Sequence, residues 1–88
     1  METVRMGKTL KVSDREIKKL VRDFENENDV DIFWDHEIWE MRVMFHMRRG
    51  RIWAKSYHYI PYDDLTTEKV IETINEMYME ILEKIKSA

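Results

Sequence analysis

The sequence contains no cysteine, a single proline and only two glycines. Without cysteine the chain can form neither a disulfide nor a zinc–thiolate site, so a hydrophobic core has to stabilise its fold. Few prolines and glycines predict few loops. No apolar run approaches the roughly 18 residues that cross a bilayer, and the chain starts without the basic and apolar regions of a signal peptide. We therefore expect no membrane contact and a cytoplasmic location.

The composition indicates one globular domain over residues 1–88. The chain has 88 residues, of which 43% are hydrophobic and 38% charged, as is typical of a folded domain rather than a disordered chain. The net charge of −3 hides alternating blocks: +4 in residues 1–22, −8 in 23–41, +5 in 42–62 and −4 in 63–88. Such blocks make oppositely charged surface patches, which affect the choice of partner more than the fold.

Two helices and one strand are predicted at the two ends of the sequence. Residues 4–12 alternate as a short strand does. A helix over about 14–26 is predicted by the capping box Ser13–Glu16 and by apolar residues at helical spacing. A longer helix over about 67–86 follows Thr66, a suitable N-cap. The apolar residues of the two helices are Ile17, Leu20, Val21 and Phe24 in the first, and Val70, Ile71, Ile74, Met77, Tyr78, Ile81, Leu82 and Ile85 in the second.

The central residues 29–60 predict a three-stranded antiparallel meander. Two-residue turns are expected at Arg49-Gly50 and at His36-Glu37. The first implies the pairs Met47–Ile52, Phe45–Ala54, Val43–Ser56, Met41–His58 and Trp39–Ile60, and the second implies Trp34–Trp39, Ile32–Met41 and Val30–Val43. Both registers place the same residues of the middle strand on the apolar face: Trp39, Met41, Val43, Phe45 and Met47. Since a slip of one residue would reverse the faces, this agreement supports the meander.

The expected fold is therefore a two-layer α+β domain in the order (β)-α-β-β-β-α. Its core would be an antiparallel three-stranded meander, to which residues 4–12 would add a fourth strand, with both helices on one face of the sheet. Ala54 and Ser56 are small, which would let a helix approach the last strand closely.

The order helix, three strands, helix resembles that of double-stranded-RNA-binding domains and, more loosely, that of small toxins with the same topology. The resemblance is architectural and covers about residues 13–86. It implies no site residues, because Asp63, Asp64 and Glu68 stand where the RNA-binding family has a lysine cluster at the start of its last helix. The Gly-Ser-His strand of the toxins is absent as well.

The other face of the predicted sheet should meet solvent, yet it carries large side chains. Its expected cross-strand rows are Phe33–Glu40–Tyr59, Asp31–Arg42–Tyr57, Met44–Lys55, His46–Trp53 and Arg48–Arg51. An ion pair between Asp31 and Arg42 is expected in the second row, where exposure would make it weak. The predicted partner-binding residues on this face are Phe33, Arg42, Met44, His46, Arg48, Trp53, Lys55, Tyr57 and Tyr59.

Three interpretations of this face stay open. In the first, the aromatic pairs only stabilise a thin sheet, and cations shield the rings. In the second, the face binds protein, either a second copy of the chain or another macromolecule, since Tyr, Trp, Met and Arg are enriched in interface cores. In the third, the rings stack on unpaired bases and the cations contact phosphates, although a pI near 5.6 disfavours nucleic acid.

We favour the second interpretation. The chain would then be a non-enzymatic protein-binding module that associates with itself or binds and inhibits a partner, as small viral or mobile-element accessory proteins do. Binding of single-stranded nucleic acid or RNA through the same face is the alternative.

A second basic feature runs along the first predicted helix and the residues before it: Lys8, Lys11, Arg15, Lys18, Lys19 and Arg22. This stripe either faces phosphates or is a solvated helix surface opposed by glutamates of the last helix. Those glutamates are Glu72, Glu76, Glu80 and Glu83. We favour the solvated surface.

No catalytic, metal or cofactor site is predicted, and no small-molecule substrate is evident. His36 lies in a polar Asp-His-Glu turn, whose three consecutive residues cannot all point one way. His58 falls on the core side near Met41, where a hydrogen bond is its simplest role. His46 faces outward beside Trp53, without a nucleophile or carboxylate to work with. The two glycines are too few for a phosphate-binding loop, and we expect no enzyme activity.

Overall fold

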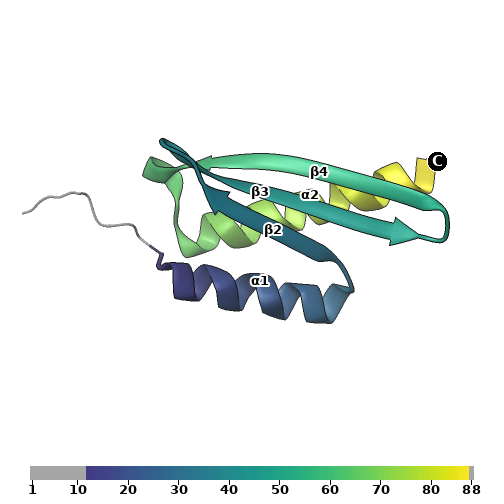
Figure 1. The fold of residues 1–88 in the computed structure, drawn as a ribbon, viewed down its shortest axis with the longest axis horizontal. Helices are drawn as coiled ribbons and strands as arrows, with labels where there is room; N and C mark the ends of the chain where they lie inside the picture. Colours follow the sequence, from purple (N-terminus) through teal and green to yellow (C-terminus); the bar gives the residue numbers. More distant parts are fainter. Residues whose placement is uncertain (1–11, 88) are drawn as a thin grey trace, which may run out of the picture.

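The computed structural model describes residues 12–87, so the strand predicted over 4–12 lies almost wholly outside the described residues. The elements are α1 (Asp14–Asn28), β2 (Asp31–His36), β3 (Glu40–Arg49), β4 (Ile52–Pro61), the 3₁₀ turn η1 (Tyr62–Asp64) and α2 (Thr67–Ser87). The three strands form one antiparallel sheet in the order β2-β3-β4 (Figure 1). The predicted α+β class and the order of these elements are confirmed.

Helix α1 begins and ends at local signals that the sequence carries. The Ser13 hydroxyl accepts from the Glu16 amide at 3.2 Å, and the Glu16 carboxylate accepts from the Ser13 amide at 3.4 Å, which completes the predicted capping box. The helix ends where Asp29 adopts the left-handed conformation, a common way to stop a helix. Ile17 and Val21 are buried, and Leu20 and Phe24 pack at the edge of the core.

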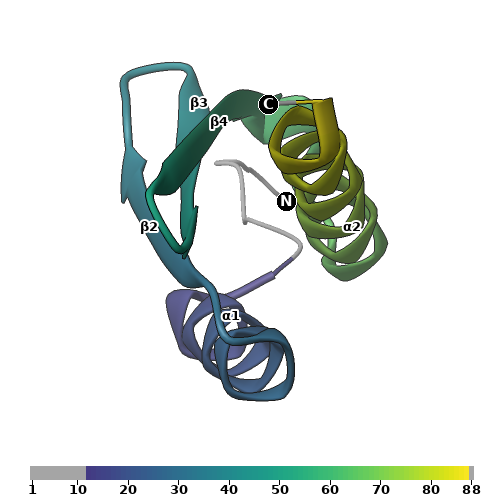
Figure 2. The same cartoon turned by 90° about the vertical axis from the view of Figure 1, so that its right-hand side faces the viewer.

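Helix α2 is capped by Thr66, whose hydroxyl accepts from the Lys69 amide at 3.1 Å. It packs over β4 and β3, whereas α1 lies along β2 and touches α2. Figure 2, viewed along the long axis, shows both helices on the same side of the sheet. The buried residues of α2 are Val70, Thr73, Ile74, Met77 and Ile81. Neither helix of residues 12–87 has the length and apolar character needed to cross a bilayer.

Along strand β3, buried residues alternate strictly with half-buried ones, as a sheet with helices on one face only requires. Met41, Val43, Phe45 and Met47 are each at most 3% exposed and point to the helices, while the residues between them are half-buried on the open side. On β4 the small residues Ala54 and Ser56 are buried beneath α2. The expected close approach of a helix to this strand is therefore confirmed.

The register between β3 and β4 differs from the predicted one by two residues. Arg49 pairs with Ile52, so the turn is Gly50-Arg51 and not Arg49-Gly50. The reason is that Gly50 has φ 63° and occupies the first central position, which is where type II′ hairpin turns place glycine. A shift by two residues keeps every side chain on its predicted face.

The register between β2 and β3 differs from the predicted one by four residues. His36 pairs with Met41, and the Glu37 amide donates to the Glu40 carbonyl at 2.7 Å, so residues 37–39 form the loop. Because the shift is again an even number of residues, each strand residue keeps its predicted face, but Trp39 lies outside the sheet. Instead of lying in the core as predicted, its side chain is 81% exposed.

Replacing Gly50 with alanine tests the turn. A Cβ at Gly50 would meet no heavy atom within 4 Å, so the cost is conformational only. We expect Gly50→Ala to lower the free energy of unfolding by about 1 kcal/mol, measured by urea denaturation. Arg51→Ala, at the other turn position, should change the free energy of unfolding by only a few tenths of a kcal/mol. Equal effects of the two substitutions would contradict this turn assignment.

Candidate binding surface

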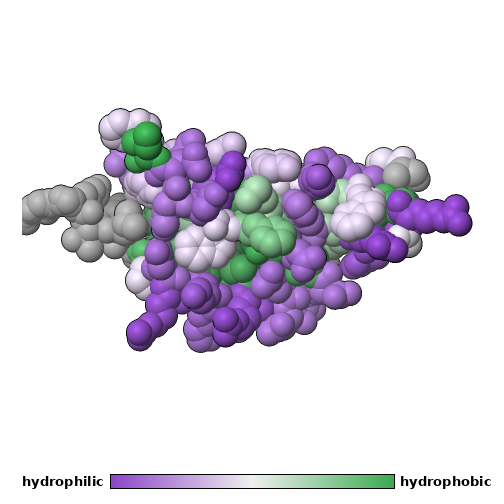
Figure 3. Space-filling model, in the orientation of Figure 1, coloured by the Kyte–Doolittle hydropathy of each residue, from purple (hydrophilic) through white to green (hydrophobic). Residues whose placement is uncertain are grey.

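The side of the sheet opposite the helices carries all nine predicted partner-binding residues. In the observed registers its rows are Glu40–Pro61, Asp35–Arg42–Tyr59, Phe33–Met44–Tyr57, Asp31–His46–Lys55 and Arg48–Trp53. We call this surface the open face. Figure 3, in the orientation of Figure 1, shows pale and green side chains along its middle, with hydrophilic purple above and below. The predicted rows were wrong, but the predicted membership of the face is preserved.

The middle row is the apolar centre of the open face. Phe33 and Tyr57 are both 51% exposed and flank the half-buried Met44. Tyr59, in the next row, is 50% exposed. Side chains of this size would each bury substantial area if another surface covered them. No helix of the described residues covers this side of the sheet.

Arg42 is held by Asp35 and not by Asp31, which corrects the predicted ion pair. Its Nε donates to Asp35 Oδ1 at 3.1 Å and its Nη2 donates to Asp35 Oδ2 at 2.6 Å, so the guanidinium binds both carboxylate oxygens. These hydrogen bonds and the charge of Asp35 raise the pKa of Arg42 above its ordinary value. The pair is partly exposed, so it orients Arg42 on the surface more than it stabilises the fold.

The hairpin end of the open face is basic. The Arg48 guanidinium lies 5.4 Å from the centre of the Trp53 ring, close enough for a cation–π contact. Its Nε also donates to the Gly50 carbonyl at 2.9 Å, which fixes the side chain over the ring. Lys55 and Arg51 are exposed nearby. Trp53 itself is 61% exposed, so a large ring and several cations meet solvent together.

His46 lies next to Phe33 and not next to Trp53 as predicted. The centroids of the two rings are 5.3 Å apart in an edge-on arrangement. Its cross-strand neighbours are Asp31 and Lys55. The Nε2 atom is buried and has no hydrogen-bond partner among the described residues. His46 therefore contributes a ring contact to the open face, and the expectation that no carboxylate residue lies beside it was wrong, because the observed register pairs it with Asp31.

The sequence analysis missed an exposed apolar pair, Ile38 and Trp39, in the loop between β2 and β3. Both side chains are 81% exposed, and hydrophobic atoms project at this corner in Figure 3. The pattern had placed Trp39 inside because it continues the alternation of β3. The sequence carries no turn signal here, because residues 37–40 include no Gly, Pro, Asn or Asp. The hydrogen bond between the Glu37 amide and the Glu40 carbonyl leaves these two residues outside the ladder.

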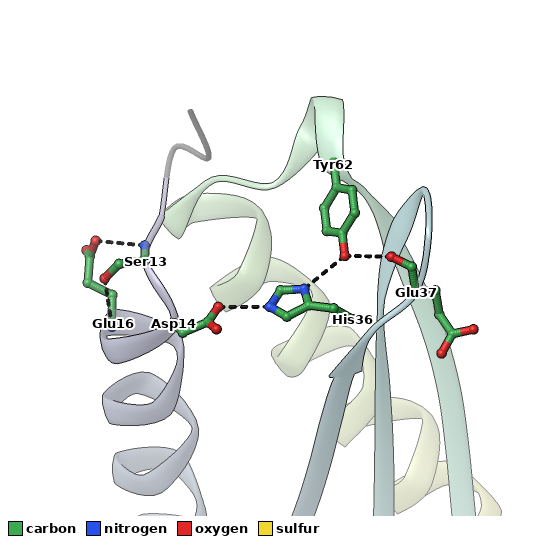
Figure 4. A network of polar contacts seen from close by, with 6 residues as sticks. All are labelled: Ser13, Asp14, Glu16, His36, Glu37 and Tyr62. Atoms are coloured by element: carbon green, nitrogen blue, oxygen red, sulfur yellow. Dashed lines mark hydrogen bonds and ion pairs between the residues drawn. The ribbon is translucent and has the colours of Figure 1, made fainter. Parts of the chain in front are cut away.

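His36 is not in a turn but at the end of β2, where it joins three elements (Figure 4). Its Nε2 lies 2.8 Å from Asp14 Oδ1 at the start of α1, and its Nδ1 lies 3.0 Å from the Tyr62 hydroxyl. That hydroxyl donates to the Glu37 carbonyl at 2.7 Å. Burial, followed by the nearby Asp14 charge, raises the pKa of Tyr62, which keeps the hydroxyl protonated. This network holds the end of the sheet to α1.

His58 lies on the helix side, opposite Val43 and not near Met41 as predicted. Its Nε2 lies 3.0 Å from Glu80 Oε2, and Ser56 donates to Glu80 Oε1 at 2.6 Å. The Ser56 hydrogen bond is the main reason that the pKa of Glu80 lies below its ordinary value, while partial burial opposes it. The three side chains fasten α2 to β4, so His58 has the hydrogen-bonded role expected for it.

Within residues 12–87, no ion pair joins the acidic residues of α2 to the basic residues of α1. A shallow groove beside β4 is lined by His58 and several α2 residues, including Glu72, Glu76 and Glu83. Among residues 12–87 no group of three or more His, Asp or Glu side chains is placed to hold a metal ion. Within the stripe, Lys19 pairs with Asp23 of its own helix at 3.0 Å, and Glu72 pairs with Lys69.

Comparison of the chain with protein-family models, with curated proteins and with solved structures finds no match.

Glu80 should make the stability of the protein sensitive to acid. Because its pKa is lower in the folded state, its contribution is complete above its unfolded pKa of about 4.3 and is lost as the pH falls through the folded value. We expect Glu80→Gln to lower the free energy of unfolding by about 1 kcal/mol at pH 7. The variant should also lose less of its free energy of unfolding than wild type does as the pH falls. Urea denaturation between pH 7 and pH 3 measures both, with Glu83→Gln on the same helix as the control. Parallel pH profiles for wild type and Glu80→Gln would contradict the assignment.

Proposed function

We propose that this protein is a non-enzymatic protein-binding module that uses the open face of its sheet. The observation that carries the proposal is the half-exposed row Phe33–Met44–Tyr57, with Tyr59 beside it, on a side that neither helix covers. Contiguous exposed apolar surface on a small domain is typical of an interaction site. Tyr, Trp, Met and Arg, the residue types gathered here, are those enriched in interface cores.

The mechanism we propose is burial of the rings, with charge setting orientation. Trp53, Phe33, Tyr57 and Tyr59 would supply most of the binding free energy, because large rigid rings lose little conformational entropy when they are covered. Arg42, Arg48 and Lys55 sit among them, two already held in place by Asp35 and by Trp53. Charges fixed in this way choose between partners and speed encounter more than they add affinity.

A second candidate function, binding of single-stranded nucleic acid, is favoured by one observation. Arg48 and Lys55 lie on the same face as Trp53 at the hairpin end, with Arg49 and Arg51 at the turn beside it, an arrangement in which a base could stack while phosphates are neutralised. The two functions differ in salt dependence. Nucleic-acid binding should weaken steeply as salt rises, and the slope should fall when one of these cations is replaced. Protein binding through the rings should persist at moderate salt.

Truncating two rings of the open face tests the proposed function. We expect the double variant Trp53→Ala/Tyr57→Ala to lose association, with each central ring contributing on the order of 2 kcal/mol, or about 30-fold in affinity. The readouts are self-association by light scattering, retention of partner proteins from an extract of the source cells, and binding of single-stranded oligonucleotides, each near physiological salt.

The matched control is Met79→Ala on α2, because Met79 and Trp53 are both 61% exposed. It should leave every readout unchanged. If the double variant changes none of the three readouts, the open face is not a binding surface. If it affects only oligonucleotide binding, the second candidate function replaces the first.

A further inference from the structure

The residues of the open face are spaced evenly on either side of Met44. The two ends of the face carry charges of opposite sign. On β3, Glu40 and Arg48 each lie four residues from Met44 and point to the same side. On β4, Tyr57 is the partner of Met44, and Trp53 and Pro61 are equally placed about it. The middle row carries no charge. At one end Glu40 adds a negative charge to the ion pair of Asp35 and Arg42, and at the other end Arg48 and Lys55 outnumber Asp31. The two ends therefore carry opposite net charges.

A surface of this kind is complementary to itself under one particular rotation. A two-fold axis that crosses the strands at the middle row would reverse the strand direction and bring each end of the face over the opposite end of a second copy. Glu40 would then face Arg48 of the second copy, and the two middle rows would cover each other. On β2, Asp31 would face Asp35 of the second copy, whose charge is already paired with Arg42. A two-fold axis parallel to the strands would instead stack Glu40 on Glu40 and Arg48 on Arg48, which like charges oppose.

We propose, on the basis of the function proposed above, that the partner of the open face is a second copy of this chain, packed face to face with antiparallel strands. Two pairs of Glu40 and Arg48 then close the ends of the interface, because two-fold symmetry repeats every contact. Trp53 lies over Pro61 of the second copy, and Lys55 lies over the ring of Tyr59, where a cation–π contact can form. Twisted sheets that pack in this way cross at about 30°.

The size of the face predicts a weak dimer. Ten residues of β3, ten of β4 and six of β2, at about 3.4 Å per residue and about 4.8 Å per strand, give a face of roughly 420 Å². The two copies together would bury roughly 850 Å², at the small end of the range where weak interfaces lie. We therefore expect a dissociation constant on the order of 10–100 µM near physiological salt, and a dimer that separates on dilution.

Charge reversal at the two ends tests the arrangement. Molar mass is measured by light scattering and sedimentation equilibrium over about 5–500 µM, a range that brackets the expected constant. Wild type should dimerise with concentration. Glu40→Arg alone and Arg48→Glu alone should each dimerise at least about 10-fold more weakly, because each creates two like-charge contacts. An equimolar mixture of the two variants should recover the wild-type affinity as a heterodimer, since both of its contacts are then between opposite charges.

Circular dichroism confirms that each variant is folded, and Glu76→Arg on α2 serves as a charge-reversal control that should dimerise as wild type does. A wild type that stays monomeric over the whole range overturns the self-association. A wild-type dimer whose two variants fail to recover in the mixture overturns the antiparallel arrangement. Neither result removes the proposed protein-binding function, which the truncation of Trp53 and Tyr57 tests separately through retention of other proteins.

Discussion

The pleat of β3 is the constraint on which the rest of the structure depends. β3 is the only strand of the described residues with a neighbour on each side, so its alternation defines both faces of the sheet. Met41, Val43, Phe45 and Met47 form the floor of the core beneath the helices. The residues between them form the central column of the open face. Because successive side chains of a strand point in opposite directions, the domain builds its core and its exposed surface from the same ten residues.

The sequence was sufficient for the faces of the sheet but not for its registers. A period of two is set by side-chain burial, and a register that is wrong by two or four residues satisfies it equally well. The exact register depends on backbone geometry at the turns: Gly50 takes positive φ at the first position of its turn, and the Glu37–Glu40 hydrogen bond closes a longer loop. These local energies, of about 1 kcal/mol each, leave little trace in an apolar pattern. The helices were better defined, because Ser13, Glu16 and Thr66 mark their first turns directly.

The same limit explains which parts of the candidate surface could be predicted. All nine residues assigned to the open face lie on it, since membership depends only on parity. Their neighbours depend on register, so the partners of Arg42 and His46 were wrong. Trp39 was predicted in the core for the same reason, and it is exposed because the observed register places it in the loop of residues 37–39. Contacts between distant segments, such as His36 with Asp14 and Tyr62, have no periodic signal at all.

The long hairpin also determines how the molecule moves through solution. Its two strands of ten residues each span about 34 Å, whereas the three strands of the sheet side by side span only about 14 Å. An elongated particle experiences more friction than a sphere of equal mass, so the monomer should elute from a sizing column ahead of its true mass. Two such elongated molecules packed face to face form a particle of about twice the thickness and nearly the same length. Association through the sheet would therefore make the particle rounder, and its frictional ratio would fall as its mass doubles.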